Sequence, residues 1–261
     1  MNRKDFVKAC ALTTAGFALT GFKPGENFIP PAAVTKKIFL TGGGFDLKTL
    51  HYIIGLTGKL KPKICFLPTP VGDSEAHITR WKAAAKELSF EPYVQKVFIS
   101  SSEQTISFED TLLSVDAILV TGGNTLNAMA LWKAHGIDQI LRKAWERGIL
   151  LSGASAGAIC WFEQGLSDSR PQQLSKVEGL GFLKGSTCPH YTNEVNRRST
   201  YLKMIQSKEL LAGYGCDESA GLYFENDALV RVVTGKISDR AYKISRKNGR
   251  IIESELHAEL L

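Results

Sequence analysis

The chain has 261 residues, of which 44% are hydrophobic, and its net charge is +6. This length allows one sizeable core, and no run of five or six basic residues indicates a nucleic-acid-binding arm. The five cysteines form no CxxC pair and no even spacing, so the sequence signals no metal site, cofactor or disulfide framework. We expect Cys65, Cys160 and Cys188, which lie in apolar contexts, to be small buried hydrophobes.

The first 35 residues differ from the rest and are predicted to be an export signal and linker. Arg3, Lys4 and Lys8 precede an apolar run at 9–22, which is too short for a stable membrane span. The start NRKDFVK resembles the twin-arginine motif, with Lys4 where the second arginine usually stands. We therefore expect export to a periplasmic or extracytoplasmic location. The alternative is an amphipathic N-terminal helix on a cytoplasmic protein. No later stretch is apolar enough to span a membrane.

From residue 36 onward, short apolar runs alternate with helical patterns. Strands are predicted at 37–42, 63–69, 93–99, 117–123 and 149–153, and helices at 46–58, 73–88, 124–136 and 137–148. Asp46, Asp73 and Asn124 are the expected helix N-caps. Nearly continuous apolar strands that alternate with helices favour a doubly wound α/β fold, with a mostly parallel sheet flanked by helices.

Past residue 210 the pattern changes to β-rich runs joined by tight turns. Asn226-Asp227 and Asn248-Gly249 each lie between such runs, as hairpin turns with positive φ require. We therefore expect antiparallel C-terminal hairpins that extend the sheet. Without an internal repeat or a long linker after residue 35, residues 36–261 are predicted to form a single catalytic domain.

The stretch GASAGAICWF contains the frame GxSxG around Ser155, directly after an apolar strand. Active sites of parallel sheets collect where strands end, and small flanks such as Gly153 and Gly157 allow the tight turn of a nucleophile elbow. The N–H of Ala156 is then positioned to meet a developing oxyanion. The alternative is a helix start built from small residues for packing.

A nucleophilic serine needs a base, and His190, just after the strand-like run that ends at Pro189, is the best placed of the five histidines. His51 and His77 lie in helical patterns and His135 lies at a helix end, where solvent-facing or capping roles are expected.

The third member of a triad is an acid, and two orders are open: Asp168 before the histidine, or Glu218 after it, with Asp217 as a neighbouring substitute. A trio of Ser155, Asp227 and His257 would follow the chain order of α/β-hydrolases, but Asp227 lies in a predicted hairpin turn.

Taken together, the stretches KIFLTGGG, ILVTGGNTLNAM, GASAGAICWF, PHYTNE and GYGCDESAGLYFEND resemble the serine peptidase family of dipeptidase E and cyanophycinase. The resemblance implies a class I glutamine amidotransferase-like (flavodoxin-like) fold. It implies Ser155 as nucleophile, His190 as base, and the N–H groups of Gly123 and Ala156 as the oxyanion hole. For the third member, the cyanophycinase-like branch suggests Glu218, which we favour, and the dipeptidase E branch suggests an acid near Asp168.

The resemblance further implies hydrolysis of short peptides through an acyl-enzyme, without a metal or cofactor. Dipeptidase E prefers an N-terminal aspartate, which requires a cation, so Arg197 and Arg198, with Asn124 of the GGN turn, are the expected substrate-binding residues. The alternatives are a cyanophycinase-like exopeptidase and a catalytically silent binding module. Ser155 argues against a glutamine amidotransferase, which uses cysteine. We expect a small peptide as partner, no nucleic acid, and a homodimer as one assembly open to the chain.

Overall fold

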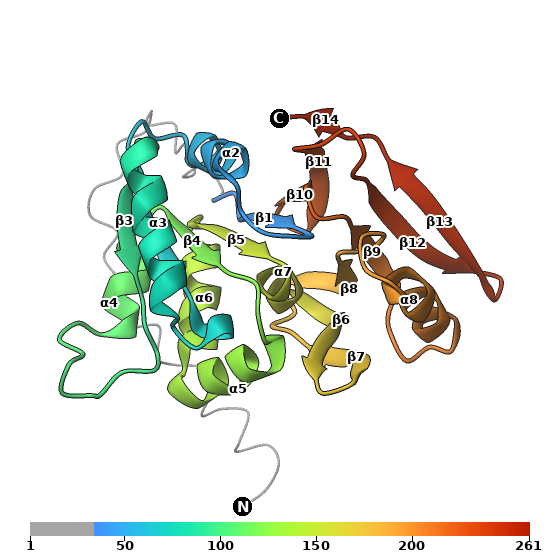
Figure 1. The fold of residues 1–261 in the computed structure, drawn as a ribbon, viewed down its shortest axis with the longest axis horizontal. Coiled ribbons are helices and arrows are strands. Elements are labelled where there is room, and N and C mark those ends of the chain that lie inside the picture. The colour runs from blue at the N-terminus through green and yellow to red at the C-terminus, as the bar shows by residue number, and fades with distance from the viewer. Residues whose placement is uncertain (1–33) are drawn as a thin grey trace, which may run out of the picture. The chain divides into compact units, whose positions relative to one another are not determined.

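The computed structural model describes residues 34–261, in which two β-sheets are flanked by helices (Figure 1). Residues Val34–Leu261 cluster as one compact unit. The predicted export signal falls on residues 1–33 and lies outside the described part of the chain. Among the described residues, no helix combines the length and apolar character that a membrane crossing requires.

Eight strands form the first sheet, in the order β14-β11-β10-β1-β5-β4-β2-β3, and its parallel half lies close to prediction. The parallel strands are β1 (Lys37–Thr41), β2 (Lys63–Leu67), β3 (Glu91–Val94), β4 (Ala117–Val120) and β5 (Leu150–Ala154). The helices are α2 (Leu47–Thr57), α3 (Glu75–Glu87), α4 (Phe108–Leu113), α5 (Thr125–His135), α6 (Ile137–Glu146) and α7 (Ala156–Trp161), with a 3₁₀ turn at Thr69–Val71.

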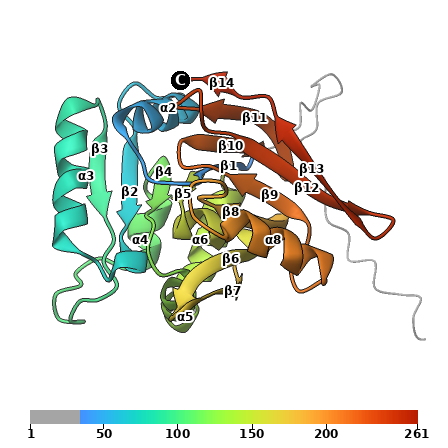
Figure 2. The same cartoon turned by 45° about the vertical axis from the view of Figure 1, so that its right-hand side comes forward.

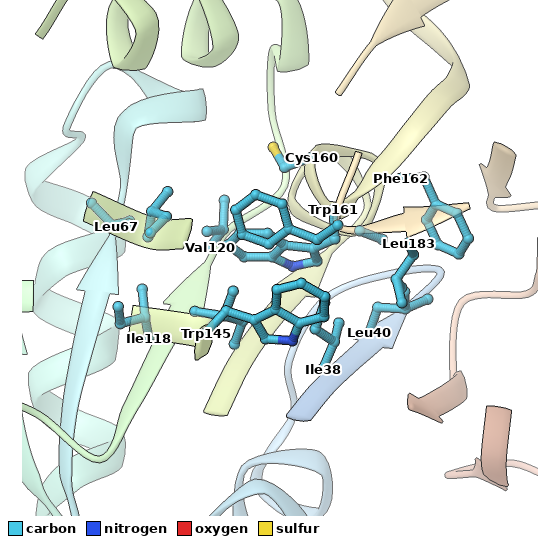
Figure 3. Packing of buried hydrophobic residues seen from close by; sticks show 14 of the residues in the cluster. Ile38, Leu40, Leu67, Ile118, Val120, Trp145, Cys160, Trp161, Phe162 and Leu183 are labelled. Carbon is cyan, nitrogen blue, oxygen red and sulfur yellow. The ribbon is translucent and has the colours of Figure 1, made fainter. Parts of the chain in front are cut away.

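The two faces of this sheet are buried in separate cores, which confirms the predicted doubly wound fold. Ile38 and Leu40 of β1 pack in one core, against α4 to α7 (Figure 3), whereas Phe39 packs in the other, against α2 and α3. A strand buried on both faces has no polar alternation, and this explains the continuous apolar runs in the sequence. Asp46 caps α2 and Asn124 caps α5, as predicted.

The strand predicted at 93–99 is present but lies at Glu91–Val94, and the predicted cap at Asp73 is wrong, for one shared reason. Asp73 has a positive φ of 56° and is buried, and its carboxylate accepts hydrogen bonds from the N–H groups of Val97 and Phe98. These N–H groups are therefore unavailable to a strand ladder, and β3 ends at Val94. Ser74 takes the N-cap position of α3 instead.

The antiparallel extension is correct for only one of the two predicted hairpins. The strands β10 (Ala220–Glu225) and β11 (Ala228–Thr234) turn at Asn226-Asp227 and extend the first sheet beside β1, and β14 (Glu259–Leu260) pairs with β11. The hairpin of β12 (Ala241–Lys247) and β13 (Arg250–Leu256) instead lies in a second sheet. Asn248 and Gly249 in its turn both have positive φ, as expected.

The second sheet has six strands in the order β13-β12-β9-β8-β6-β7. Its other members are β6 (Phe162–Arg170), β7 (Gln173–Glu178), β8 (Leu183–Pro189) and β9 (Gly213–Cys216), and α8 (Arg197–Gln206) packs on it. In Figure 1 the strands β9, β12 and β13 lie on the right with α8, and they come forward in Figure 2. Because β8 and β9 are parallel neighbours, with Pro189 paired to Cys216, the segments that follow them start side by side.

Cys65, Cys160, Cys188 and Cys216 are buried free thiols, which confirms the expectation for the first three. Burial raises the pKa of Cys65 to about 12, so this thiol stays protonated at neutral pH.

Candidate active site

Ser155 lies at the turn between β5 and α7, and its backbone is strained. Its φ of 51° and ψ of −109° form a conformation that side-chain-bearing residues rarely adopt. The Ser155 N–H donates to the carbonyl of Thr41 at 3.1 Å, which ties the turn to the end of the neighbouring β1. The tight turn places Ser155 at the carboxyl end of β5, at the edge of the sheet.

The flanking glycines are needed because backbones pass close to them. A Cβ on Gly153 would lie 2.1 Å from the carbonyl oxygen of Gly157, and a Cβ on Gly157 would lie 2.3 Å from that of Val120. Only a residue without a side chain allows β5, α7 and β4 to approach this closely. Gly153 and Gly157 therefore act by letting three elements pack around the elbow.

His190 reaches Ser155 from the second sheet. It follows β8 directly, with a φ of 51°, and its Nε2 lies 2.9 Å from Ser155 Oγ. This distance allows the hydroxyl to donate to the imidazole, as a serine nucleophile and its general base require. The structure thus joins a serine from one sheet to a histidine from the other.

The two N–H groups expected to bind an oxyanion lie beside this pair. Ala156 is the first residue of α7, and Gly123 belongs to the turn after the parallel neighbour β4. Within residues 34–261, neither N–H donates to a protein acceptor. Gly123 has a φ of 129°, and a Cβ there would lie 2.3 Å from the carbonyl oxygen of Pro70, so glycine is required.

Two carboxylates approach the far nitrogen of the imidazole. Glu218 Oε1 lies 3.7 Å from His190 Nδ1, and Glu194 Oε1 lies 3.9 Å from it. Both distances exceed a hydrogen bond, and His190 Nδ1 is buried without a partner among the described residues. The TGGG turn after β1 supports Glu218, whose carbonyl accepts from the N–H of Gly43 at 2.8 Å.

The other predicted acids have different partners. Asp168 Oδ2 lies 3.2 Å from Nη2 of Arg197 and forms no ion pair with His190. Asp217 is 2% exposed and accepts from the N–H and hydroxyl of Thr192, both at 2.8 Å, and from the N–H of Arg240. Asp217 therefore braces the loop that follows His190. Of the acids predicted from the sequence, Glu218 is the one that faces the imidazole.

The three side chains predicted to bind substrate form ion pairs or hydrogen bonds within the protein. Arg197 is 2% exposed and pairs with Asp168 and Glu194, and the guanidinium of Arg198 pairs with Glu253. Asn124 accepts from the Asn127 N–H to cap α5 and donates to a backbone carbonyl. None of the three lines the cavity at Ser155. The sequence identified basic residues near His190, but not the carboxylates that would engage them.

A cavity of about 460 Å³ opens at Ser155 and His190. Apolar and aromatic side chains form much of its wall, including Phe45, Phe66 and Trp81, and α3 contributes two further groups, His77 and Arg80. His77, for which a solvent-facing or capping role was expected, is half-buried and lines the cavity. Arg80 is exposed and forms no ion pair among the described residues, so its charge is available to a ligand.

Sequence reasoning missed His77 and Arg80, although a signal was present. They are three residues apart on the helix that follows the strand-end turn PTPVGD, so they share one helical face at the active edge of the sheet. Among residues 34–261, no group of three or more His, Cys, Asp or Glu side chains could hold a metal ion.

A contact beside the site leads to a prediction on pH. The Arg198 hydrogen bond holds the pKa of Glu253 below its usual 4.5, against the effect of burial, and the Tyr191 hydroxyl adds to this lowering. Because the folded pKa is depressed, the carboxylate stabilises the fold above about pH 4.5, and this contribution is lost as the pH falls through the folded value.

Glu253→Gln is therefore expected to lower the free energy of unfolding by about 1 kcal/mol at pH 7 and by much less at pH 3. Urea unfolding of both proteins at the two pH values measures the difference. An equal difference in the free energy of unfolding at pH 7 and at pH 3 would contradict the role given to the Glu253 carboxylate.

Comparison with known proteins shows the family of the chain. Residues 38–232 match the profile described as peptidase family S51. The chain is 41% identical over 229 residues to a Bacillus subtilis protein named "Uncharacterized peptidase YgaJ". The matched region covers 86% of this chain and 98% of that protein. It is 29% identical over 168 residues to "Uncharacterized peptidase Lin0382" of Listeria innocua, covering 60% of this chain and 78% of that one.

The fold is also shared with a solved structure. The crystal structure of a peptidase from an acI-B1 actinobacterium superposes with a TM-score of 0.64 at 20% identity, over 87% of this chain and 96% of that chain. This likeness supports the predicted class I glutamine amidotransferase-like fold. The serine peptidase family indicated by the sequence motifs is thus confirmed, and the chain belongs to peptidase family S51.

Proposed function

We propose that this peptidase hydrolyses short peptides through Ser155 as nucleophile, His190 as general base and Glu218 as the acid that steadies the base. The observation that carries the proposal is the 2.9 Å contact between Ser155 Oγ and His190 Nε2, at a strained elbow that opens into a cavity. A strained serine paired with an imidazole is the arrangement that serine nucleophiles require.

The proposed reaction has two stages. His190 Nε2 takes the proton of Ser155 as Oγ attacks the peptide carbonyl, and the N–H groups of Gly123 and Ala156 donate to the oxyanion that forms. The imidazolium then protonates the leaving amine, and an acyl-enzyme remains. Water, activated by the same histidine, attacks the ester and releases Ser155.

The proposed substrates are peptides with an N-terminal aspartate, and the cation that would select them is Arg80. An aspartate side chain needs a charged partner in an otherwise apolar cavity, and a guanidinium can bind a carboxylate through two hydrogen bonds. Arg80 supports this role because it lines the cavity and pairs with no carboxylate of residues 34–261, whereas Arg197 and Arg198 are both paired.

The experiment is the hydrolysis of a dipeptide panel by the purified protein, with and without prior treatment with a fluorophosphonate. We expect hydrolysis that the fluorophosphonate abolishes. Release of β-Asp-Arg dipeptides from cyanophycin in place of dipeptide cleavage would favour the cyanophycinase-like alternative. A folded protein that cleaves nothing and does not react would favour the binding module and contradict the proposal.

Arg80→Gln is expected to lower kcat/KM for Asp-Leu by about 10- to 100-fold, and to leave Leu-Leu unaffected, because only the acidic peptide loses a charge-assisted hydrogen bond. Parallel assays of the two dipeptides measure this. Lys82→Gln is the matched control, since Lys82 is an exposed cation of the same helix that does not line the cavity. An equal loss of kcat/KM for both peptides, or no loss for either, would contradict the proposed specificity for an N-terminal aspartate.

A further inference from the structure

We propose that Glu194 is a second carboxylate at Nδ1 of His190, a positioning residue that shares the imidazole with Glu218 and is itself aligned by the buried guanidinium of Arg197. The inference deepens the proposed function and rests on it. Its starting point is the buried Nδ1 of His190, which has no hydrogen-bond partner in the described part of the chain. Two carboxylates lie at nearly the same distance from it, 3.7 Å for Glu218 and 3.9 Å for Glu194.

The turn after β8 aims Glu194 at the base. The Glu194 N–H donates to the carbonyl of His190 at 3.2 Å, a helix-like contact that brings residues four apart to the same side of the turn. The Glu194 carbonyl in turn accepts from the N–H of Arg197 at 3.4 Å. The backbone therefore fixes the direction of the Glu194 side chain before any contact of its carboxylate is considered.

Arg197 then fixes the carboxylate itself. Its Nε donates to Oε2 of Glu194, so the other oxygen, Oε1, is the one that faces His190. The Arg197 side chain is 2% exposed, and a guanidinium buried to this extent must be paired. Its second partner is Asp168, at 3.2 Å from Nη2. Asp168 does not contact the imidazole, but it is the second partner of Arg197, the cation that holds Glu194.

Glu218 is held in a different way. Its backbone N–H donates to the side chain of Asn193 at 2.8 Å and its carbonyl accepts from Gly43, but its carboxylate pairs with no lysine or arginine among the described residues. Glu194 is thus aligned through its side chain, and Glu218 is aligned through its backbone. A shift of less than about 1 Å would bring either within hydrogen-bond distance of Nδ1.

Two carboxylates at Nδ1 have a consequence for the reaction. The N–H at Nδ1 needs one acceptor to keep Nε2 free as the base, and both negative charges stabilise the imidazolium that forms when Ser155 loses its proton. The charged or titratable groups that face the imidazole are Glu194 and Glu218 on this side, with His77 and Arg80 lining the same cavity. Removal of one carboxylate leaves the other in place, so each compensates in part for the loss of the other.

The test compares Glu194→Gln, Glu218→Gln and the double variant, by the pH profile of kcat/KM and by the rate at which a fluorophosphonate labels Ser155. We expect either single change to lower both rates by roughly 10-fold, and the double change to lower them by about 10³-fold or more, because residues with a shared partner are not additive. The acid limb of the profile should move to lower pH in Glu194→Gln, since glutamine does not stabilise the imidazolium.

Two further variants separate this role from a structural one. Asp168→Asn is expected to have a small effect, because Arg197 keeps Glu194, and Glu146→Gln, an exposed acid of α6, is the control without effect. The inference is overturned if Glu194→Gln keeps the wild-type pH profile, or if the double variant equals Glu218→Gln. Failure of the proposed function is a different result: the wild-type protein is then neither labelled at Ser155 nor active on any peptide.

Discussion

Ser155→Ala is expected to lower kcat by about 10⁴-fold or more without loss of the fold. The substitution removes the only atom that would form the acyl-enzyme, whereas the His190 imidazole and the Gly123 and Ala156 N–H groups stay in place. Alanine accepts the same backbone conformation at the same cost as serine, so the elbow is expected to be retained. The measurement is single-turnover hydrolysis of the best dipeptide found in the panel.

Ser155→Gly provides the matched control for backbone strain. Glycine adopts a φ of 51° with a ψ of −109° without a steric cost, so this variant is expected to be more stable than Ser155→Ala by about 1 kcal/mol and equally inactive. Thermal unfolding of the two inactive variants gives the difference. Turnover by Ser155→Ala at the wild-type rate would place the nucleophile elsewhere.

Gly153→Ala is the change expected to damage the fold most. The new Cβ would lie 2.1 Å from the Gly157 carbonyl oxygen and 2.7 Å from Nε1 of Trp161, in a buried place where the backbone cannot easily move aside. Overpacking of a core typically costs about 1–3 kcal/mol, and a clash with backbone atoms lies at the upper end of this range. We expect a protein that is largely insoluble or unfolds at much lower temperature, as measured by circular dichroism.

Gly55→Ala is the control for the same substitution in open space. Gly55 lies in α2, and no atom of residues 34–261 lies within 4 Å of an added Cβ, so alanine is expected to raise the stability by up to about 1 kcal/mol through its helix propensity. If Gly153→Ala unfolded at the wild-type temperature, the close approach of β5 to α7 would be wrong.

The sequence predicted the parts of the fold whose signals are local. The apolar runs of β1, β2, β4 and β5 are buried on both faces, so their composition alone indicates a parallel sheet. Asp46 and Asn124 predicted helix starts because a side chain that caps a helix acts within three residues. The elbow at Ser155 and the strand end at His190 were predicted for the same reason, and the structure brings these two side chains together.

The parts that the sequence did not predict depend on distant contacts. The second sheet was missed because β6 and β7 mix exposed and buried residues without a clear period. The hairpin of β12 and β13 was predicted, but its sequence does not show which sheet it joins. Arg198 was predicted to be a free cation because Glu253, which pairs with it, lies 55 residues later in the chain. Asp73 read as a helix cap because its true partners, Val97 and Phe98, are more than 20 residues away.

The proposed mechanism depends most directly on Ser155 being the nucleophile that His190 activates. The measurement that tests it is the residue modified by a fluorophosphonate, located by tandem mass spectrometry of the wild-type protein at neutral pH. The proposed mechanism predicts one phosphonyl group per chain, on Ser155. It also predicts that His190→Ala abolishes this labelling. Modification of a different residue, or labelling of Ser155 at an unchanged rate without His190, would contradict it.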